Sequence, residues 1–376
     1  MRILVEQSVL QKATARVASA AARGGEIIIL NNLLIDATPV GVWLVATDLA
    51  IEVRARIQAD VQVEGQVTVN AADLGEIARN APKGAEIALE LDVDADPRLQ
   101  VRFGRSRYKM PALPGEDFPE FPAMEGATSI TITSAELGQV LDRVHFAQSS
   151  DETRYYLNGV FLEKVSVAGE PVLRAVATDG LRLAVDECPA PTGEPMTSVI
   201  IPRKSVIELR RLIGDHTGPV TVSTSKAAIA VEAGEVRMIS KVVEGSYPDY
   251  LRVIPQKWDR EITFDRELLA AAVKRASIIG SEKARRVKLT IDEGLLTLAV
   301  RNTESGEATE QIEIEDDGGF FEASFTARHV LDALDQSDGS RVVFRFTDNA
   351  SPTRLEPHPS DSAGSGTLCV LSPLRA

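Results

Sequence analysis

Residues 5–17 read VEQSVLQKATARV, residues 132–144 read ITSAELGQVLDRV, and residues 264–276 read FDRELLAAAVKRA. Each stretch opens with a strand-like residue, continues with a polar position of the kind that begins helices, and then carries apolar residues at helical spacing. These three patterns decide the fold, because recurrence at one interval of roughly 130 residues is typical of a repeated structural unit.

A second helical pattern follows each of these stretches at a similar interval. It reads VNAADLGEIARNAPKG at residues 69–84, IPRKSVIELRRLIGD at 201–215 and FTARHVLDALDQSDG at 325–339. Stretches such as VWLVATDLAIEVRARI (42–57) and LRAVATDGLRLAVDE (173–187) lie between the helices, and their alternating apolar residues indicate half-buried antiparallel strands. Two helix signals that recur three times in the same order indicate triplication rather than coincidence.

Proline-bearing connectors follow the first two repeats. LPGEDFPEFP (113–122) and VEGSYPDYLRVIP (243–255) each place an aromatic–proline pair after a strand, as expected of segments between domains. We therefore expect three α+β domains, each with two helices packed on antiparallel sheets, over residues 1–126, 127–255 and 256–376. Domains joined through their sheets would place all the helices on one side.

The composition fits a multidomain protein of the cytoplasm. A chain of 376 residues, 44% of them apolar, fills several cores, and no stretch approaches the roughly 18 apolar residues of a membrane span. The first residues do not resemble a signal peptide, and the two cysteines, Cys188 and Cys369, lack metal-site spacing. We expect no membrane partner.

The net charge of −14 argues against a protein that binds nucleic acid over its whole surface. Lysine and arginine nevertheless concentrate on the helical patterns, whereas carboxylates are frequent in strands and turns. Helices that turn these cations towards duplex DNA would contact phosphates without reading bases. For any single position, an ordinary solvated cation is an equally good explanation. The candidate DNA-facing residues are Lys12, Arg16, Arg23, Arg79, Lys83, Arg203, Lys204, Arg210, Arg211, Lys274 and Arg275, with Arg328 in the last helix.

No constellation of catalytic residues stands out. The chain has neither GxxxxGK[ST] nor a GxGxxG that opens a helix, and its four histidines are scattered without ligand spacing. The alternating Asp92, Asp94 and Asp96 fit a solvated strand face, and Asp179 in VATDG fits a turn between strands. We expect a non-catalytic protein without cofactor or metal. The alternatives are a metal-dependent nuclease and a plain interaction scaffold.

Several longer motifs point to one family. They are GRSRYKM at 104–110, the LPGEDFP that follows it, RYYLNG at 154–159, VATDGLRLAV at 176–185, SYPDY at 246–250, SEKARRVKL at 281–289 and the terminal PLRA. Together they resemble the β subunit of bacterial DNA polymerase III, the sliding clamp, along essentially the whole chain. The resemblance implies a head-to-tail homodimer that closes into a ring around duplex DNA. It also implies a clamp loader that opens the ring, and DNA polymerases and other proteins that bind the ring through short peptides.

The resemblance places a peptide-binding pocket between the second and third repeats. Such a cleft would hold a short extended peptide with apolar anchors. For Leu157 and Leu183, ordinary core packing is an equally good explanation. Leu181 stands where the family often has histidine and Ser372 where methionine is common, so we expect a wider or differently gated pocket. The implied residues are Leu157, Leu183, Val253 and Val370 in the floor, Thr178 and Gly180 in one wall, Pro248, Pro373 and Leu374 at the rim, and Arg154, Arg182, Arg375 and Tyr156 as polar anchors.

A ring of two chains also needs a head-to-tail interface. Opposite charges beside a small apolar plug would pair two sheet edges, and a heterologous contact that closes after two copies makes a ring. On one side we expect a strand that carries Arg105, Arg107, Tyr108 and Met110. On the other we expect Ile278 and Ile279 with a strand that carries Glu304, Glu307 and Glu310.

Overall fold

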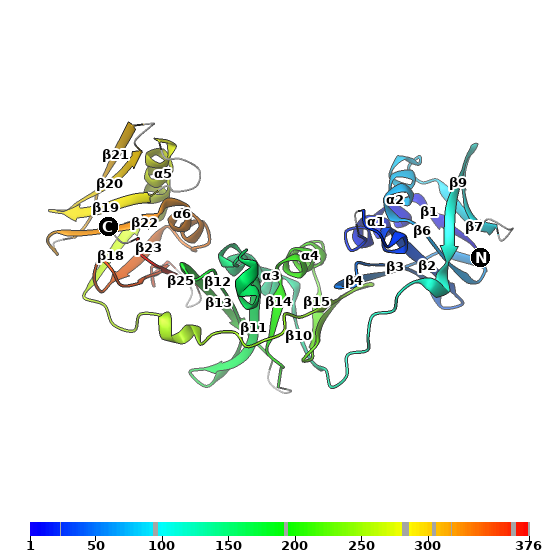
Figure 1. Ribbon diagram of the computed structural model, residues 1–376, viewed down its shortest axis with the longest axis horizontal. Coiled ribbons are helices and arrows are strands. Elements are labelled where there is room, and N and C mark those ends of the chain that lie inside the picture. Colours follow the sequence, from blue (N-terminus) through cyan, green and yellow to red (C-terminus); the bar gives the residue numbers. More distant parts are fainter. Residues whose placement is uncertain are drawn as a thin grey trace. The chain divides into compact units, whose positions relative to one another are not determined.

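The computed structural model describes residues 1–22, 24–92, 97–191, 195–279, 286–302, 306–316, 318–361 and 366–374; its elements are labelled in Figure 1. Contacts within the chain divide it into two compact units. The N-terminal unit comprises Met1–Ala135, Gly193–Val199 and Ile207–Val242, and the C-terminal unit comprises Glu136–Thr192, Ile200–Val206 and Val243–Ala376. The middle third of the chain therefore contributes to both units.

The N-terminal unit is built on one antiparallel sheet, which has thirteen strands in the described part of the chain. The pairing of β17 with β4, in which Met238 lies opposite Val53, joins strands of the middle third to strands of the first third. In spatial order the strands are β10 (Thr128–Thr133), β15 (Pro219–Thr224), β16 (Ala228–Ala233), β17 (Val236–Lys241), β4 (Ile51–Ile57), β3 (Gly41–Thr47), β2 (Asn32–Thr38), β6 (Gly65–Asn70), β9 (Ser106–Pro114), β8 (Arg98–Phe103), β7 (Glu86–Asp92), β1 (Arg2–Glu6) and β5 (Asp60–Val63).

Two helices of this unit pack together, and one of them also packs against β4. Helix α1 (Gln7–Val17) buries Leu10 and Val17 completely. Helix α2 (Ala71–Asn80) begins after Asn70, whose Oδ1 accepts a hydrogen bond from the backbone N–H of Asp73 (3.0 Å). That cap supplies a partner to one of the N–H groups that a helix start leaves unpaired.

The C-terminal unit contains two antiparallel sheets, with helices α5 (Arg266–Ala276) and α6 (Ala327–Asp335) packed together. The pairing of β13 with β25 joins the middle third of the chain to the last third. In spatial order one sheet has β14 (Val199–Pro202), β11 (Gly159–Val167), β12 (Glu170–Thr178), β13 (Arg182–Pro189), β25 (Leu368–Leu371), β24 (Thr353–Pro357), β23 (Arg341–Phe346) and β18 (Arg260–Asp265), and the other has β21 (Gly306–Glu313), β20 (Leu295–Asn302), β19 (Arg286–Asp292) and β22 (Phe321–Thr326).

The helices recur as the sequence predicts. Within the described residues they form two sets of three, at an interval of roughly 130 residues. One set is α1, α3 (Ser134–Val144) and α5, and the other is α2, α4 (Arg203–Gly214) and α6. The predicted fold class, three α+β repeats with antiparallel sheets, is confirmed. The short 3₁₀ turns are η1 (Ile28–Asn31), η2 (Gly115–Asp117), η3 (His145–Ala147), η4 (Glu152–Leu157), η5 (Tyr250–Val253) and η6 (Ser277–Ile279).

Candidate functional site

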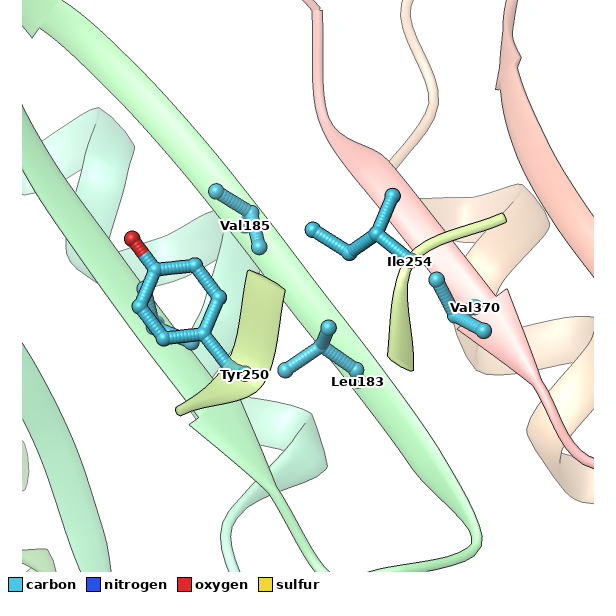
Figure 2. Close-up of a cluster of buried hydrophobic side chains, with 6 residues drawn as sticks. Leu183, Val185, Tyr250, Ile254 and Val370 are labelled. Atoms are coloured by element: carbon cyan, nitrogen blue, oxygen red, sulfur yellow. The ribbon is translucent and has the colours of Figure 1, made fainter. Parts of the chain in front are cut away.

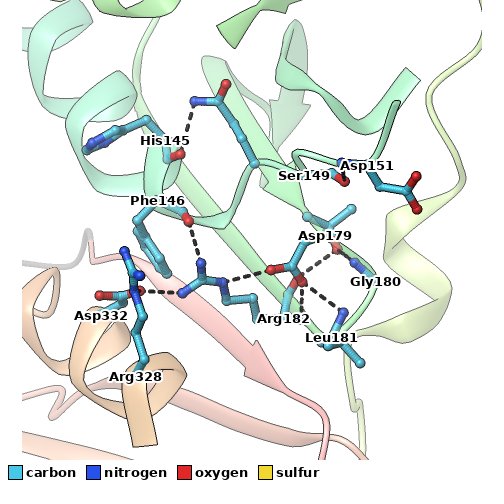
Figure 3. Close-up of polar contacts among 12 residues, drawn as sticks. His145, Phe146, Ser149, Asp151, Asp179, Gly180, Leu181, Arg182, Arg328 and Asp332 are labelled. Carbon is cyan, nitrogen blue, oxygen red and sulfur yellow. Dashed lines mark hydrogen bonds and ion pairs between the residues drawn. The ribbon is translucent and has the colours of Figure 1, made fainter. Parts of the chain in front are cut away.

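Side chains of the VATDG motif fix the turn between β12 and β13. Asp179 Oδ1 accepts hydrogen bonds from the backbone N–H groups of Leu181 (2.9 Å) and Arg182 (3.1 Å). The hydroxyl of Thr178 donates to the carbonyl oxygen of Arg182 (2.6 Å) and accepts from the N–H of Gly180 (3.0 Å), whose φ is +88°. Figure 3 shows Asp179 bonded to this turn. Asp179 is therefore a turn-forming residue, as predicted.

Arg182 ties this turn to two other elements. Its guanidinium donates to Asp179 Oδ2 (3.1 Å), to the carbonyl oxygen of Phe146 (2.7 Å) and to Asp332 of α6 (Figure 3). It also lies over the Phe146 ring, 5.1 Å from the centroid, and only 9% of the side chain is exposed. Arg182 was expected to be a polar anchor for a peptide. In this structure its donors point into the protein instead, so it holds the turn in place.

Leu183 and Val370, two of the expected floor residues, lie opposite each other where β13 pairs with β25. Both belong to one buried apolar cluster, in which the linker residues Tyr250 and Ile254 lie over the two strands (Figure 2). The apolar floor therefore joins the middle and last thirds of the chain through side chains as well as through the sheet. The cluster comprises Val176, Leu183, Val185, Tyr250, Ile254 and Val370.

Tyr250 holds the linker in place by hydrogen bonds as well as by packing. Its hydroxyl donates to Glu163 Oε1 (2.6 Å) and accepts from Arg174 Nη1 (2.8 Å), and Arg174 pairs with Glu187 (2.6 Å). Burial and the hydrogen bond to Glu163 raise the pKa of Tyr250. The phenol therefore stays protonated at neutral pH and remains a donor.

Apolar side chains next to this cluster are open to solvent. Leu181 and Val253 are each 52% exposed, and Leu251 is 54% exposed. In the segment YLRVI, Tyr250 and Ile254 pack on the sheet whereas Leu251 and Val253 face solvent. Such side chains beside a buried floor suit a short apolar peptide. Val253 was expected in the floor, but it is exposed beside the floor. Tyr250 and Ile254, which pack on the sheet, were not expected. A proline-bearing linker has no periodicity to show which of its residues face inward.

The segment after β25 is held by backbone hydrogen bonds. The N–H of Ser372 donates to the carbonyl oxygen of Leu181 (2.9 Å), and that of Leu374 donates to Ser324 (2.7 Å). The two residues that depart from the family pattern, Leu181 and Ser372, are therefore hydrogen-bonded neighbours. Ser372, Pro373 and Leu374 are half-buried. The expected anchor Arg375 lies outside the described residues.

The remaining expected pocket residues lie on η4 and in the linker. Leu157 is buried at the end of η4, Tyr156 is half-buried and Pro248 is exposed. Arg154 Nε pairs with Asp151 (2.9 Å). A Cβ atom on Gly180 would lie 2.6 Å from Arg154 Nη1, so the glycine leaves room for this arginine.

A buried carboxylate lies in the same unit, on β13. Asp186 is 1% exposed; it accepts a hydrogen bond from Thr367 (3.2 Å) and faces Arg143 Nη1 (3.4 Å). Arg143 also pairs with Asp338. Burial raises the pKa of Asp186 to about 6, although Arg143 and Thr367 act in the opposite direction. This group was not found from the sequence, because nothing in the pattern of β13 distinguishes Asp186 from a solvated strand residue.

Most of the candidate DNA-facing cations are exposed, on helices or, for Lys83, in the turn after α2, but several are paired with neighbouring groups. Arg211 donates to the carbonyl oxygen of Arg16 (2.7 Å), and together with Lys12 they line a cavity of about 510 Å³ in the N-terminal unit. Arg275 pairs with Glu310 (2.6 Å). Arg23 lies outside the described residues. The exposed candidates are Lys12, Arg16, Arg79, Lys83, Arg203, Lys204, Arg211, Lys274, Arg275 and Arg328, while Arg210 is half-buried.

The basic side of the expected interface lies at a sheet edge in the N-terminal unit. Strand β9 pairs with β6 only through Ala112–Pro114, so its residues 106–111 have a strand partner on the β8 side alone among the described residues. Arg107 and Tyr108 are exposed there, and Arg105 lies in the preceding turn. Met110 differs from its neighbours: it is only 5% exposed and belongs to the core.

The acidic side lies at a sheet edge in the C-terminal unit. Strand β21 is the end strand of its sheet in the described chain. It carries Glu307 and Glu310, which pair within the chain with Arg301 (3.2 Å) and Arg275. Ile278 in η6 is 73% exposed and Ile279 is half-buried. Glu304 lies outside the described residues.

The described residues contain no group of three or more His, Cys, Asp or Glu side chains placed to hold a metal ion. Burial raises the pKa of Cys188 and of Cys369 to about 12, so neither is a ready thiolate nucleophile. Asp92 accepts a hydrogen bond from Gln100 (3.1 Å), and Asp94 and Asp96 lie outside the described residues. None of the described helices is long and apolar enough to span a membrane.

Comparison with known proteins identifies one family along the chain. Residues 1–122 match the N-terminal domain of the DNA polymerase III beta subunit, residues 131–249 its central domain and residues 251–368 its C-terminal domain. The beta sliding clamp of Caulobacter vibrioides is 42% identical over 376 residues, all of both chains. The crystal structure of the DNA polymerase sliding clamp from Caulobacter crescentus superposes with a TM-score of 0.94 at 41% identity, over all of both chains. The sliding clamp from Bartonella birtlesii bound to griselimycin has a TM-score of 0.93 at 37% identity, again over all of both chains.

Proposed function

Because the chain belongs to the family of DNA polymerase III beta subunits, the bacterial sliding clamps, we propose that two copies close head to tail into a ring around duplex DNA. The chain is a DNA sliding clamp, a processivity factor of DNA polymerase III without catalytic activity. The ring itself, its loose contact with DNA and the residues that serve each partner are the parts that we propose.

Two sheet edges of opposite charge carry the proposal. The free part of β9 bears Arg107 and Lys109 after Arg105, and β21 bears Glu307, Glu310 and Glu313. An edge with unpaired N–H and C=O groups invites a second strand, and opposite charges select the partner edge. Pairing of β9 in one copy with β21 in another is a heterologous contact, which makes a closed ring if it repeats after two copies.

DNA would be held by topology rather than by tight binding. The exposed cations of α1, α2, α4 and α5, together with Lys83 in the turn after α2, fit loose contacts with phosphates on an otherwise acidic chain. The pairing of Arg275 with Glu310 and of Arg211 with a backbone carbonyl leaves these two less free to contact DNA. We therefore rank Lys12, Lys83 and Lys274 above them as phosphate contacts.

Polymerases and other partners would bind the C-terminal unit. The buried floor around Leu183 and Val370, with Leu181 and Val253 exposed beside it, supports binding of a short peptide with apolar anchors.

We also propose a clamp loader that opens the ring, action in the cytoplasm, and domain borders near residues 126 and 255. The separate family matches, which end at 122 and begin again at 131 and 251, support these borders.

Retention on circular DNA tests the ring. The chain is loaded by a clamp loader onto nicked circular plasmid, separated from free protein by gel filtration, and the plasmid is then cut once. We expect retention on the circle and release on linearisation. A scaffold without a ring would not be retained on either form, and a nuclease would show magnesium-dependent turnover; either result would contradict the proposal.

A further inference from the structure

The chain contains a second turn with the hydrogen bonds of the β12–β13 turn. Between β3 and β4, Asp48 Oδ1 accepts from the backbone N–H groups of Ala50 (2.9 Å) and Ile51 (2.8 Å). The hydroxyl of Thr47 donates to the carbonyl oxygen of Ile51 (2.8 Å) and accepts from the N–H of Leu49 (3.0 Å). Leu49 has a φ of +72° and so reproduces the conformation of the glycine in the other turn. The two turns are copies of one repeated element.

The strands after the two turns correspond as well. The motif VATD occurs at residues 45–48 and 176–179, so Glu52 of β4 stands at the place of Leu183 of β13. Glu52 lies opposite Ile239 where β4 pairs with β17, just as Leu183 lies opposite a residue of β25. The N-terminal unit therefore has its own copy of the peptide-floor junction, with a carboxylate at the position of the leucine.

A linker also crosses this second junction. Phe121 and Met124 pack against a cluster that contains Ile239, as Tyr250 and Ile254 do in the C-terminal unit. Beside it lies a cavity of about 590 Å³. The cavity is lined by Glu52 and Arg54 of β4, Trp43 of β3, Arg237 of β17 and Phe118 of the linker, among others.

One carboxylate oxygen of Glu52, which lines this cavity, accepts no hydrogen bond from the described residues. The residue is 2% exposed. Its Oε1 accepts a hydrogen bond from Arg54 Nε at 2.5 Å, whereas Oε2 is buried and has no hydrogen-bond partner among the described residues. A buried carboxylate oxygen without a donor costs free energy. A ligand that brings an N–H donor to Oε2 would remove that cost.

The charge of the lining favours a cation. Six carboxylates and three guanidinium groups line the cavity. Each guanidinium group already has a partner. Arg54 pairs with Glu52 and Arg56 donates to a backbone carbonyl. Arg237 lies within ion-pair distance of Glu232 (3.2 Å), although its buried Nε makes no hydrogen bond among the described residues. The remaining negative charge selects a positively charged donor.

We propose that the cavity at the β4–β17 junction is a second docking site, which binds an arginine or lysine side chain of a partner protein through Glu52 Oε2. The site is a repeat-related copy of the peptide floor whose selectivity has changed from apolar to cationic, because Glu52 stands where the other copy has Leu183. A partner could then contact one chain at two places with two different chemistries.

Fluorine NMR of the full-length chain tests this site. The chain has two tryptophans, Trp43 in the cavity and Trp258 in the C-terminal unit, so 5-fluorotryptophan labelling supplies a reporter and an internal reference. The probes are acetyl-Gly-Arg-Gly amide, its lysine analogue and its neutral citrulline analogue. We expect the arginine and lysine peptides to shift the Trp43 signal saturably and leave Trp258 unchanged, and the citrulline peptide to bind at least about tenfold more weakly, as expected when a charge-assisted hydrogen bond is lost.

Matched variants separate the site from general electrostatic attraction. Glu52→Gln should weaken the arginine peptide at least about tenfold, whereas Glu76→Gln, the same change of charge on α2, should leave its affinity unchanged. In each free variant, an unaltered Trp258 signal and a Trp43 signal that differs from its position in urea show that the variant is folded. Equal binding of the arginine and citrulline peptides, no effect of Glu52→Gln, or no shift of Trp43 with any probe would each overturn the proposal. Because the assay uses neither DNA nor a clamp loader, these results are independent of ring formation.

Discussion

The carboxyl group of Asp186 makes the stability of the C-terminal unit depend on pH. Its folded-state pKa of about 6 lies above the ordinary value of 3.8, so the native state favours the protonated form. The stabilisation that this proton provides is fully present below pH 3.8 and is lost as the pH rises through 6. Between pH 5 and pH 8 the two pKa values imply a loss of about 1.4 kcal/mol from this one group.

Asp186→Asn removes the titration and should remove this part of the pH dependence. The parent chain should lose about 1.4 kcal/mol of unfolding free energy from this group between pH 5 and pH 8, and the variant should not. The difference, variant minus parent, should therefore rise by about 1.4 kcal/mol over this pH range. Urea titrations followed by tryptophan fluorescence measure it. In a Trp43→Phe background, Trp258 is the remaining tryptophan and reports on the C-terminal unit.

Asp338→Asn is the matched control. Asp338 faces the same Arg143, but its side chain is 44% exposed. This variant loses an ion pair and should keep most of the pH dependence, because Asp186 still titrates. If Asp186→Asn and the parent chain show the same change in stability between pH 5 and pH 8, the link between burial of Asp186 and stability is refuted.

Three further predictions concern the interface, the peptide site and the β12–β13 turn. Reversal of Arg105 and Arg107 to glutamate should give monomers in sedimentation, whereas Arg102→Glu on β8 should leave the dimer; an unchanged dimer mass in the double variant would count against pairing of β9 with β21. Val253→Asp should weaken binding of an apolar clamp-binding peptide at least about tenfold by calorimetry without changing the unfolding midpoint, because Val253 is 52% exposed; Val40→Asp, at a 72% exposed valine, is the control. Gly180→Ala should destabilise the chain by about 1 kcal/mol, because Gly180 has a φ of +88°, which L side chains rarely adopt. The contact of the new Cβ with the end of the Arg154 side chain can be relieved by movement of that side chain, so Arg154→Ala should recover little of the cost. Equal stability of Gly180→Ala and the parent chain would contradict this prediction.

The repeat and its elements could be predicted because they depend on local patterns. The helical spacing in α3 places Leu137, Val140 and Val144 on one face, and all three are fully buried. The division of the middle third between two units could not be predicted. It follows from the pairing of β17 with β4 and of β13 with β25, which joins residues far apart in the sequence and leaves no periodic signal.

The candidate peptide site was predictable in part. Resemblance to the family gave Leu183 and Val370, which the structure brings together. The resemblance also gave Arg182, but it could not show that the guanidinium of Arg182 donates its hydrogen bonds to groups within the protein. Met110 was expected on an interface strand, and residue type alone could not show that this position of β9 faces the core. Burial and hydrogen-bond partners depend on tertiary packing, which single-sequence patterns do not specify.

The two sheet junctions have a mechanical consequence. Each joins neighbouring repeats by a ladder of backbone hydrogen bonds between adjacent strands, β17 with β4 and β13 with β25. Bending the chain at either ladder would break several of these bonds at once, each worth about 1 kcal/mol. Buried apolar side chains also pack over each junction, whereas most side chains of the edge strands β9 and β21 are exposed or half-buried. We therefore expect a force that opens an assembly of this chain to separate the edges of different copies before it parts the repeats within one copy.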